Sequence, residues 1–256
     1  YNCAILDGGD VKCWGYNGYG QLGYGDTQTR GDSPGEMGDN LPTLALGQPA
    51  VDVSAGHNHA CAVLLDGTLK CWGYNGYGQL GIGDQSTRSI PVTVDLGTGM
   101  VARDVEAGTE ETCVIMVSGQ VKCWGRDYRG VLGNPGSGSY ADYFGNNNDE
   151  IADALPFIDF GPSRTAVSLS LSSYTACATL TDATTVCWGE GSSGQLGTGT
   201  TEEGKGDAPD LDGDGFADDM GEQLVDVQLW NSSIYQPSYE VDPLAQVSVG
   251  RGYNFA

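Results

Sequence analysis

The sequence predicts an all-β fold made of four related repeats, and three observations support this prediction. The string KCWGYNGYGQLG occurs at 12–23 and again at 70–81, which indicates a structural unit that is used more than once. The chain has 41 glycines in 256 residues and few residues that favour helices, so short strands joined by many turns are expected. Eight cysteines form four pairs of identical spacing, Cys-x9-Cys, so each repeat carries one pair.

Each repeat contains the same elements in the same order. A strand that ends in small residues comes first in three of them, at 51–60, 103–112 and 167–176. The cysteine pair follows, and Trp-Gly comes directly after its second cysteine. A glycine-rich corner then contributes one leucine to the core. The corners are Gly20–Gly23, Gly78–Gly81, Gly130–Gly133 and Gly194–Gly197. The unit is therefore about 50–60 residues long with four strand-like runs, which is the size of a propeller blade.

The cysteine spacing predicts four hairpin disulfides. The predicted pairs are Cys3 with Cys13, Cys61 with Cys71, Cys113 with Cys123, and Cys177 with Cys187. Asp66-Gly67 lies midway between the cysteines of the second pair and is a hairpin turn signal. A hairpin there brings the two cysteines within disulfide reach if one bulge corrects the register. Zinc binding is the competing interpretation, although zinc sites favour Cys-x2-Cys spacing. Disulfides would place the chain in an oxidising compartment: secreted, periplasmic or at the cell surface.

The string AGHNHACAVLLDGTLKCWGYNGYGQLG at 55–81 resembles the repeat of the regulator of chromosome condensation family, the RCC1-like β-propellers. All four repeats show this pattern. The resemblance implies blades of four antiparallel strands around a central axis, commonly about seven of them. The cysteine pairs and the loop GDSPGEMGDNL at 31–41 resemble secreted, disulfide-bearing bacterial members with many repeats. We therefore expect an RCC1-like β-propeller or a segment of one, with one hairpin disulfide per repeat.

The expected domain is a single RCC1-like unit at 1–256. Its repeats lie at about 1–50, 51–102, 103–166 and 167–246, and 247–256 begins or completes another blade. The last of these segments contains Gly252–Ala256, which aligns with Gly56–Ala60, while Tyr1–Cys3 aligns with His59–Cys61. Three interpretations stay open. The chain closes on itself, it is a segment of a longer repeat chain, or its last strand completes the first blade of another copy and forms a polymer.

Composition excludes several classes of function. The chain has 11 Lys and Arg against 34 Asp and Glu, a formal net charge of −23, which repels nucleic acid and anionic lipid. No apolar run approaches the roughly 20 residues of a membrane-spanning helix, so membrane insertion is not expected. The sequence contains no G-x-S-x-G, no HExxH and no P-loop, so we expect no enzyme. The nuclear exchange activity of the eukaryotic family member is not expected in so acidic a chain.

The fourth repeat contains a candidate calcium loop, D-x-D-x-D-G-x-x-D, which resembles the loops of EF-hands and dockerins. Alternate carboxylates would converge on one hard cation, and the glycine permits the sharp bend. The predicted Ca²⁺ ligands are Asp210, Asp212, Asp214, the Phe216 carbonyl, Asp218 and Glu222. Glu222 or Asp219 would have to replace the usual twelfth-position acid, because Gly221 stands there. A solvated acidic loop is the alternative.

Two further groups of side chains have a structural and a functional interpretation. His57 and His59 could hold a metal ion, but a hydrogen-bonded structural role of His59 is favoured. Tyr16 and Tyr19, with their equivalents in the second copy of the string, Tyr74 and Tyr77, are expected to pack in turns. The alternative is that these four form an exposed rim that binds a protein or a glycan.

Together these observations predict a non-catalytic extracellular protein of structural or adhesive type. It would self-assemble through the incomplete blade formed by its terminal segments, so its partner would be another copy of itself. The alternative is a monomeric secreted module that binds an extracellular protein or glycan through its long loops. A secreted relative of the family that inhibits β-lactamases shows that the fold can act purely as a protein binder.

Overall fold

The computed structural model describes residues 1–134, 142–201, 220–221 and 224–227. The described part of the chain contains thirteen strands and three short 3-10 helices. The strands are β1 (Asn2–Ile5), β2 (Val11–Trp14), β3 (Ala50–Ala55), β4 (His59–Leu64), β5 (Leu69–Gly73), β6 (Arg88–Thr93), β7 (Ala102–Ala107), β8 (Glu111–Met116), β9 (Val121–Asp127), β10 (Asp142–Phe144), β11 (Ala166–Leu171), β12 (Thr175–Leu180) and β13 (Thr185–Gly189). The 3-10 helices are η1 (Gly38–Asn40), η2 (Asn148–Glu150) and η3 (Ala152–Ala154).

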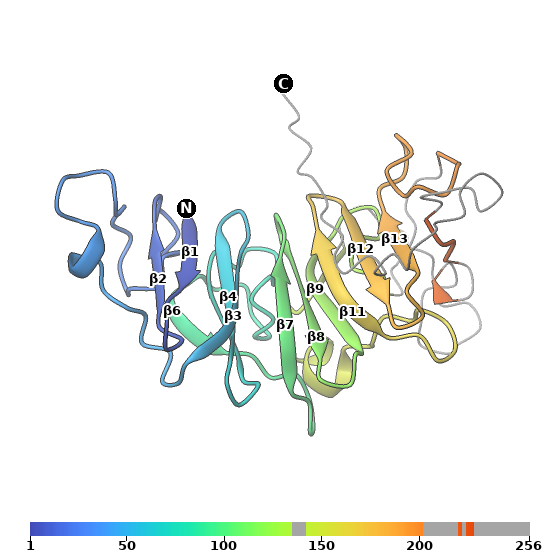
Figure 1. Cartoon of the computed structure of the whole chain (residues 1–256), viewed down its shortest axis with the longest axis horizontal. Helices are drawn as coiled ribbons and strands as arrows, with labels where there is room; N and C mark the ends of the chain where they lie inside the picture. The colour runs from blue at the N-terminus through green and yellow to red at the C-terminus, as the bar shows by residue number, and fades with distance from the viewer. Residues whose placement is uncertain (135–141, 202–219, 222–223, 228–256) are drawn as a thin grey trace, which may run out of the picture. The chain divides into compact units, whose positions relative to one another are not determined.

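These strands, most of which are labelled in Figure 1, form four antiparallel sheets, and the all-β prediction is confirmed. Hydrogen-bonded neighbours follow chain order in every sheet: β1-β2, β3-β4-β5-β6, β7-β8-β9-β10 and β11-β12-β13. The chain divides into two compact units. Unit 1 comprises 1–117, 122–126 and 143–155, and unit 2 comprises 118–121, 127–142 and 156–256. We describe each unit by itself, and the domain boundaries expected from the sequence stay a prediction.

The hairpin turns place each cysteine pair directly across two neighbouring strands. In the second repeat Leu64 N donates to Thr68 O and Gly67 N donates to Leu64 O, which closes a three-residue loop. Gly67 has φ +79°, so the bulge that the spacing predicted lies in the turn itself. Cys61 then stands opposite Cys71.

All four predicted disulfides are present. They join Cys3 to Cys13, Cys61 to Cys71, Cys113 to Cys123, and Cys177 to Cys187, with Cα–Cα distances of 4.0–4.1 Å. No cysteine of the chain is free, so no thiolate is left to bind zinc and the zinc alternative is wrong. Each disulfide therefore fastens two neighbouring strands of one hairpin.

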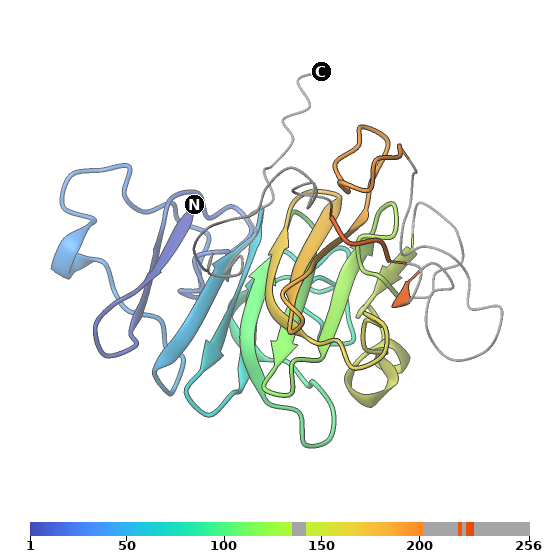
Figure 2. The ribbon, with the colours of Figure 1, turned by 45° about the vertical axis from the view of Figure 1, so that its right-hand side comes forward.

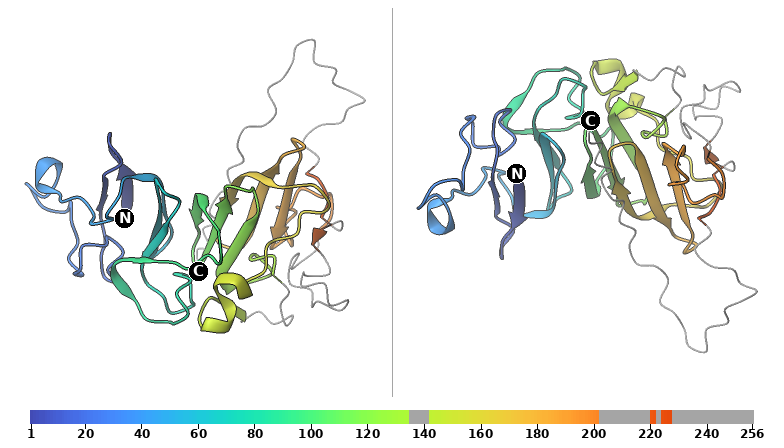
Figure 3. Two further views of the ribbon diagram at one scale, coloured as in Figure 1. Left: turned by 90° about the horizontal axis from the view of Figure 1, so that it is seen from below. Right: turned by 90° about the horizontal axis from the view of Figure 1, so that it is seen from above.

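The second strand of each complete sheet lies in the core. All six residues of β4, of β8 and of β12 are buried, and all of them except His59 and Glu111 are apolar or small. The strand before each of them, β3, β7 or β11, carries a register shift near its second residue. In unit 1 the blue hairpin of β1 and β2 packs beside β3 and β4, as Figure 2 and both views of Figure 3 show.

Candidate binding surfaces

The repeated string folds into a corner that is held by its own polar side chains. The Asn17 Oδ1 atom accepts a hydrogen bond from Leu22 N at 2.9 Å, and Gln21 Oε1 accepts one from Tyr19 N at 2.9 Å. The same two bonds recur in repeat 2, and in repeat 3 Asp127 takes the place of the asparagine. Asn17 and Gln21 are completely buried, so their amides satisfy backbone groups that the turn leaves without partners.

The corners of repeats 1, 2 and 3 each receive the tryptophan of the following repeat, and we call this contact a joint. In all three joints the indole N–H donates to the backbone carbonyl that stands two residues before the last glycine of the corner. The bonds are Trp72 Nε1 to Gln21 O (2.9 Å), Trp124 Nε1 to Gln79 O (3.0 Å) and Trp188 Nε1 to Val131 O (2.9 Å). A Cβ atom on the last glycine would come within 2.6–3.2 Å of the indole nitrogen. Glycine is therefore required there by the close approach of the ring.

The outer part of each joint pairs the same two positions through different chemistry. The two residues lie six residues after the second cysteine of one repeat and three after that of the next. The pairs are Tyr19 with Tyr74 (ring centroids 5.0 Å apart), Arg126 over Tyr77 (5.1 Å from the centroid) and Arg129 with Glu190 (2.9 Å). The joint therefore keeps its geometry while its side chains change from an aromatic pair to a cation–π pair and then to an ion pair.

In unit 1 these contacts arrange tyrosines in a row that links three sheets. Tyr16 contacts Tyr19, Tyr74 contacts Tyr77, and Tyr77 stacks on Tyr143 with an interplanar angle of 22°. The structure thus brings together all four tyrosines that the sequence singled out, and it adds Tyr143. Tyr16 and Tyr19 are 56% and 42% exposed, so this end of the row presents aromatic surface.

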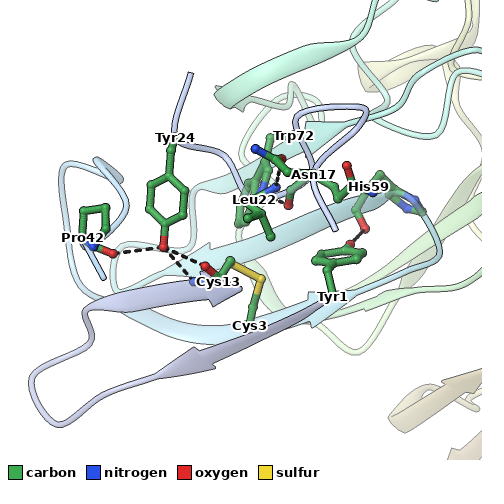
Figure 4. The surroundings of a disulfide bond; sticks show 10 residues. Tyr1, Cys3, Cys13, Asn17, Leu22, Tyr24, Pro42, His59 and Trp72 are labelled. Carbon is green, nitrogen blue, oxygen red and sulfur yellow. Dashed lines mark hydrogen bonds between the residues drawn. A yellow bond between two sulfur atoms is a disulfide. The ribbon is translucent and has the colours of Figure 1, made fainter. Parts of the chain in front are cut away.

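The first repeat has an open side, which we define as Trp14, Tyr16 and the outer edge of β1. Figure 4 shows the hairpin of this repeat with its disulfide between Cys3 and Cys13. Trp14 is partly exposed, whereas Trp72, Trp124 and Trp188 are buried to within 1%. No hydrogen bond from the Trp14 indole is present among the described residues. This repeat therefore presents a joint tryptophan that no described corner receives.

The edge of β1 has the same character. Cys3 and Cys13 face each other as a closely spaced, non-hydrogen-bonded pair, with Cα atoms 4.1 Å apart. The backbone N–H and C=O groups of Cys3 and Ile5 consequently point away from β2. In repeat 2 the equivalent groups of β4 are paired by β3. Among the described strands none pairs with this edge of β1, and β1 is partly exposed along its length whereas β4 is buried.

The disulfides of repeats 2, 3 and 4 belong to the core, because all six of their cysteines are buried. Cys123 is fully buried on β9, and Cys187 on β13 is only 6% exposed. Cys177 and Cys187 pack with Leu196, the core leucine of the repeat 4 corner. The disulfide of this repeat therefore supports the corner from beneath.

Polar side chains of β3 form hydrogen bonds with the backbone of β7, which joins the first strands of repeats 2 and 3. Asp52 Oδ2 accepts a hydrogen bond from Val105 N at 2.7 Å, and Ser54 Oγ accepts one from Ala107 N at 2.9 Å. The carboxylate of Glu106 lies 3.4 Å from Ser54 Oγ. Burial, together with the nearby charge of Asp52, raises the pKa of Glu106 from 4.5 to about 7. Burial also raises the pKa of Asp52.

The two histidines do not lie together in one site. His59 is fully buried, and its Nε2 lies 2.8 Å from Thr112 Oγ1, which itself donates to Gln79 O. Because the hydroxyl proton is directed at that carbonyl, Nε2 of His59 must be the donor. His57 is exposed, so the structural role that the sequence favoured for His59 agrees with its contacts.

The predicted calcium ligands lie outside the described residues, and the calcium site stays a prediction. These ligands are Asp210, Asp212, Asp214, Phe216, Asp218 and Glu222. Within the ranges that are described, no three His, Cys, Asp or Glu side chains are grouped to hold a metal ion. Over the same ranges no helix is long and apolar enough to cross a membrane.

Comparison with known proteins supports the repeat assignment. Two descriptions of the Regulator of chromosome condensation (RCC1) repeat match the chain, one at 8–63 and 66–115 and the other at 50–79. These matches lie in the first two repeats and the start of the third, at 8–115. The resemblance that the sequence predicted is therefore confirmed, as is the disulfide of each repeat.

Two solved structures share this fold. Prp20p from Saccharomyces cerevisiae is similar with a TM-score of 0.59 and 20% identity, over 88% of this chain and 47% of that one. Human WBSCR16 is similar with a TM-score of 0.60 and 21% identity, over 78% of this chain and 48% of that one.

Curated relatives are longer proteins. The human E3 ubiquitin-protein ligase HERC2 is 26% identical over 204 residues, which cover 78% of this chain and 4% of that protein. The Ultraviolet-B receptor UVR8 of Arabidopsis thaliana is 27% identical over 199 residues, which cover 78% of this chain and 41% of the receptor. The chain thus spans less than half the length of these two relatives.

Reasoning from the sequence missed the ionic members of the joints. Arg126 and Glu190 occupy the position of Tyr16 in their repeats, and Arg129 occupies the position of Tyr19. An alignment of the four corners would have shown that the tyrosines of repeats 1 and 2 are replaced by two arginines in repeat 3 and by an acid in repeat 4. Such a change of charge at matching positions indicates contact between neighbouring repeats. Glu106 was missed because its neighbours come from another sheet.

Proposed function

We propose that this RCC1-repeat chain is a non-catalytic extracellular protein of structural or adhesive type, which binds further copies of itself. The observation that carries the proposal is the open side of repeat 1. There the chain presents a partly exposed Trp14 and an edge of β1 with backbone groups that no described strand pairs. Unpaired strand edges favour the addition of another strand, which supplies affinity through backbone hydrogen bonds.

The covalent chemistry supports an extracellular location. All eight cysteines are joined in disulfides, one in each of the four hairpins. Disulfides persist in oxidising compartments and are rare in reducing ones. The net charge of −23 favours solubility outside the cell and disfavours nucleic acid as a partner.

Relatives support a binding role rather than catalysis in the repeats themselves. One solved structure is titled as Kap60 bound to yeast RCC1 (Prp20), and another reports binding properties of Prp20p to Gsp1p and histones. These titles concern a protein that shares the fold and binds other proteins. We propose the same general role for this chain, with itself as the partner.

A second candidate is a monomeric secreted module that binds a protein or a glycan. The exposed end of the tyrosine row, Tyr16 and Tyr19, favours it, since exposed aromatic rings supply rigid contact surface for either ligand. In that case the double variant Tyr16→Ser/Tyr19→Ser would lose the ligand.

The two candidates are separated by the mass of the native, disulfide-bonded protein. Sedimentation velocity over a wide range of concentrations should show species that grow with concentration, and electron microscopy should show end-to-end arrays. Both measurements are repeated with a calcium chelator, because the predicted loop at Asp210–Asp218 would couple calcium to assembly. A single monomeric species at every concentration would exclude self-assembly and leave the binding module.

A further inference from the structure

We infer that the chain associates head to tail, with Trp14 of one copy seated on the repeat 4 corner, Gly194–Gly197, of a second copy. The inference rests on the proposed self-assembly and specifies its contact. The same contact is made three times within the chain, where the tryptophan of one repeat hydrogen-bonds the corner of the repeat before it.

The corner of repeat 4 is built like the other corners. Gln195 Oε1 accepts a hydrogen bond from Ser193 N at 2.8 Å, as the glutamines of repeats 1 and 2 do at their corners. Leu196 is 3% exposed, and Gly197 has φ +69°. Val227 lies beside Gly197, and its backbone N–H donates a hydrogen bond to Thr185 O of β13. The corner of repeat 4 therefore has the backbone and the core anchor of a joint.

The difference lies in what covers this corner. Gln21, Gln79 and Val131, whose carbonyls accept the three indole bonds, are 0–1% exposed. Gln195, at the same position in repeat 4, is exposed. An added Cβ on Gly197 would meet only Val227, whereas the other three glycines face an indole ring. Among the described residues, then, the carbonyl of Gln195 faces no tryptophan.

Repeat 1 supplies the complementary half. Trp14 follows its cysteine as the other tryptophans follow theirs, but it is partly exposed, and its indole N–H has no hydrogen-bond acceptor among the described residues. One surface of the chain therefore offers an indole, and a different surface offers the corner that binds one. Two different complementary surfaces on one chain give heterologous contacts, which repeat from copy to copy.

The outer part of this joint identifies the residues that should meet. In each internal joint the residue six positions after the second cysteine contacts the residue three positions after the next repeat's second cysteine. In the joint between copies these are Ser193 of one copy and Tyr16 of the other. Both are exposed, so substitutions there test contact without disturbing the core.

The test copies the ion pair of the internal Arg129–Glu190 joint into the joint between copies. We would measure association by sedimentation velocity for wild type, Tyr16→Glu, Ser193→Arg and an equimolar mixture of the two variants. In the mixture, only some of the joints bring the glutamate of Tyr16→Glu in one copy against the arginine of Ser193→Arg in another. The double variant Tyr16→Glu/Ser193→Arg is therefore measured as well, because every joint between its copies contains this pair. We expect Tyr16→Glu alone to weaken association several-fold and the double variant to regain it, with a gain that is lost at high salt.

Two controls complete the design. Tyr16→Glu/Ser193→Glu places like charges in the joint and should associate more weakly than Tyr16→Glu alone. Trp14→Phe keeps an aromatic ring but removes the N–H, and we expect about fivefold weaker association, the factor that one neutral hydrogen bond supplies.

The outcomes separate the contact from the wider proposal. Association that responds to neither the charge pair nor Trp14→Phe would overturn the head-to-tail contact and leave self-assembly standing. A monomer at every concentration would overturn both. Iodide quenching of tryptophan fluorescence is compared between wild type and Trp14→Phe to isolate the signal of Trp14. If the protein is a monomer and iodide does not quench Trp14, the chain's own residues cover this ring. That result also overturns association between copies.

Discussion

The buried carboxyl of Glu106 should make the stability of this protein fall as the pH rises through the weakly acidic range. Burial, helped by the charge of Asp52, raises its pKa from 4.5 to about 7 in the folded chain. In the unfolded chain the pKa returns to about 4.5. Between these two values the folded state binds a proton that the unfolded state has released. The contribution of Glu106 to the free energy of unfolding therefore decreases from pH of about 4.5 to about 7 and is constant above.

The size of the effect follows from the two pKa values. One pKa unit corresponds to about 1.4 kcal/mol, so the difference amounts to about 3 kcal/mol. Since Glu106 is only partly buried, water screens part of its interaction with Asp52, and about 3 kcal/mol is the upper limit. The variant Glu106→Gln keeps the shape and the hydrogen-bonding capacity toward Ser54 but carries no charge. It should be more stable than wild type by up to this amount above neutral pH, and equally stable near pH 4.5.

Urea unfolding monitored by tryptophan fluorescence, with disulfides intact, measures both proteins across this pH range. Asp7→Asn is the matched control, since it removes one negative charge from an exposed position of the same acidic chain. Asp52→Asn should lower the pKa of Glu106 and move the pH-dependent step to lower pH. If the difference in the free energy of unfolding between Glu106→Gln and wild type stays constant with pH, the raised pKa of Glu106 is refuted.

Four further predictions concern single elements. Replacing Cys61 and Cys71 by alanine should cost about 3 kcal/mol in urea unfolding, since the disulfide closes a short hairpin loop. Trp72→Phe should cost about 1–3 kcal/mol in the same assay, because a buried carbonyl loses its donor. Ala183→Gly should stabilise by about 1 kcal/mol, because Ala183 has φ +64° in a turn where other repeats have glycine. Added Ca²⁺ should raise the melting temperature of wild type but not of Asp212→Asn, and an unchanged wild-type value would count against the calcium loop.

The sequence was sufficient for the hairpins because their determinants are local. Cysteine spacing, the Asp66-Gly67 turn and the glycine of each corner act within a few residues, and they predicted the disulfides and the all-β fold. The predicted alternatives for the tyrosines depended on contacts between repeats, and the structure shows both kinds of environment. Tyr77 packs between Tyr143 and Arg126, whereas Tyr16 is 56% exposed. The raised pKa of Glu106 could not be predicted, because a neighbouring sheet supplies both the burial and the charge.

The joints explain why the twelve-residue string recurs unchanged in only two of the four repeats. The invariant part of a joint is an indole, a glycine and a backbone carbonyl, and a carbonyl is supplied equally well by Gln79 and by Val131. The outer pair is free to change because its geometry is set by the corner backbone beneath it. Selection for a specific order of repeats can therefore act on the residues of the outer pair. These residues form an ion pair at Arg129–Glu190 and present an exposed aromatic ring at Tyr16. The residues that distinguish one joint from another are thus the ones that would select the partner of the open side.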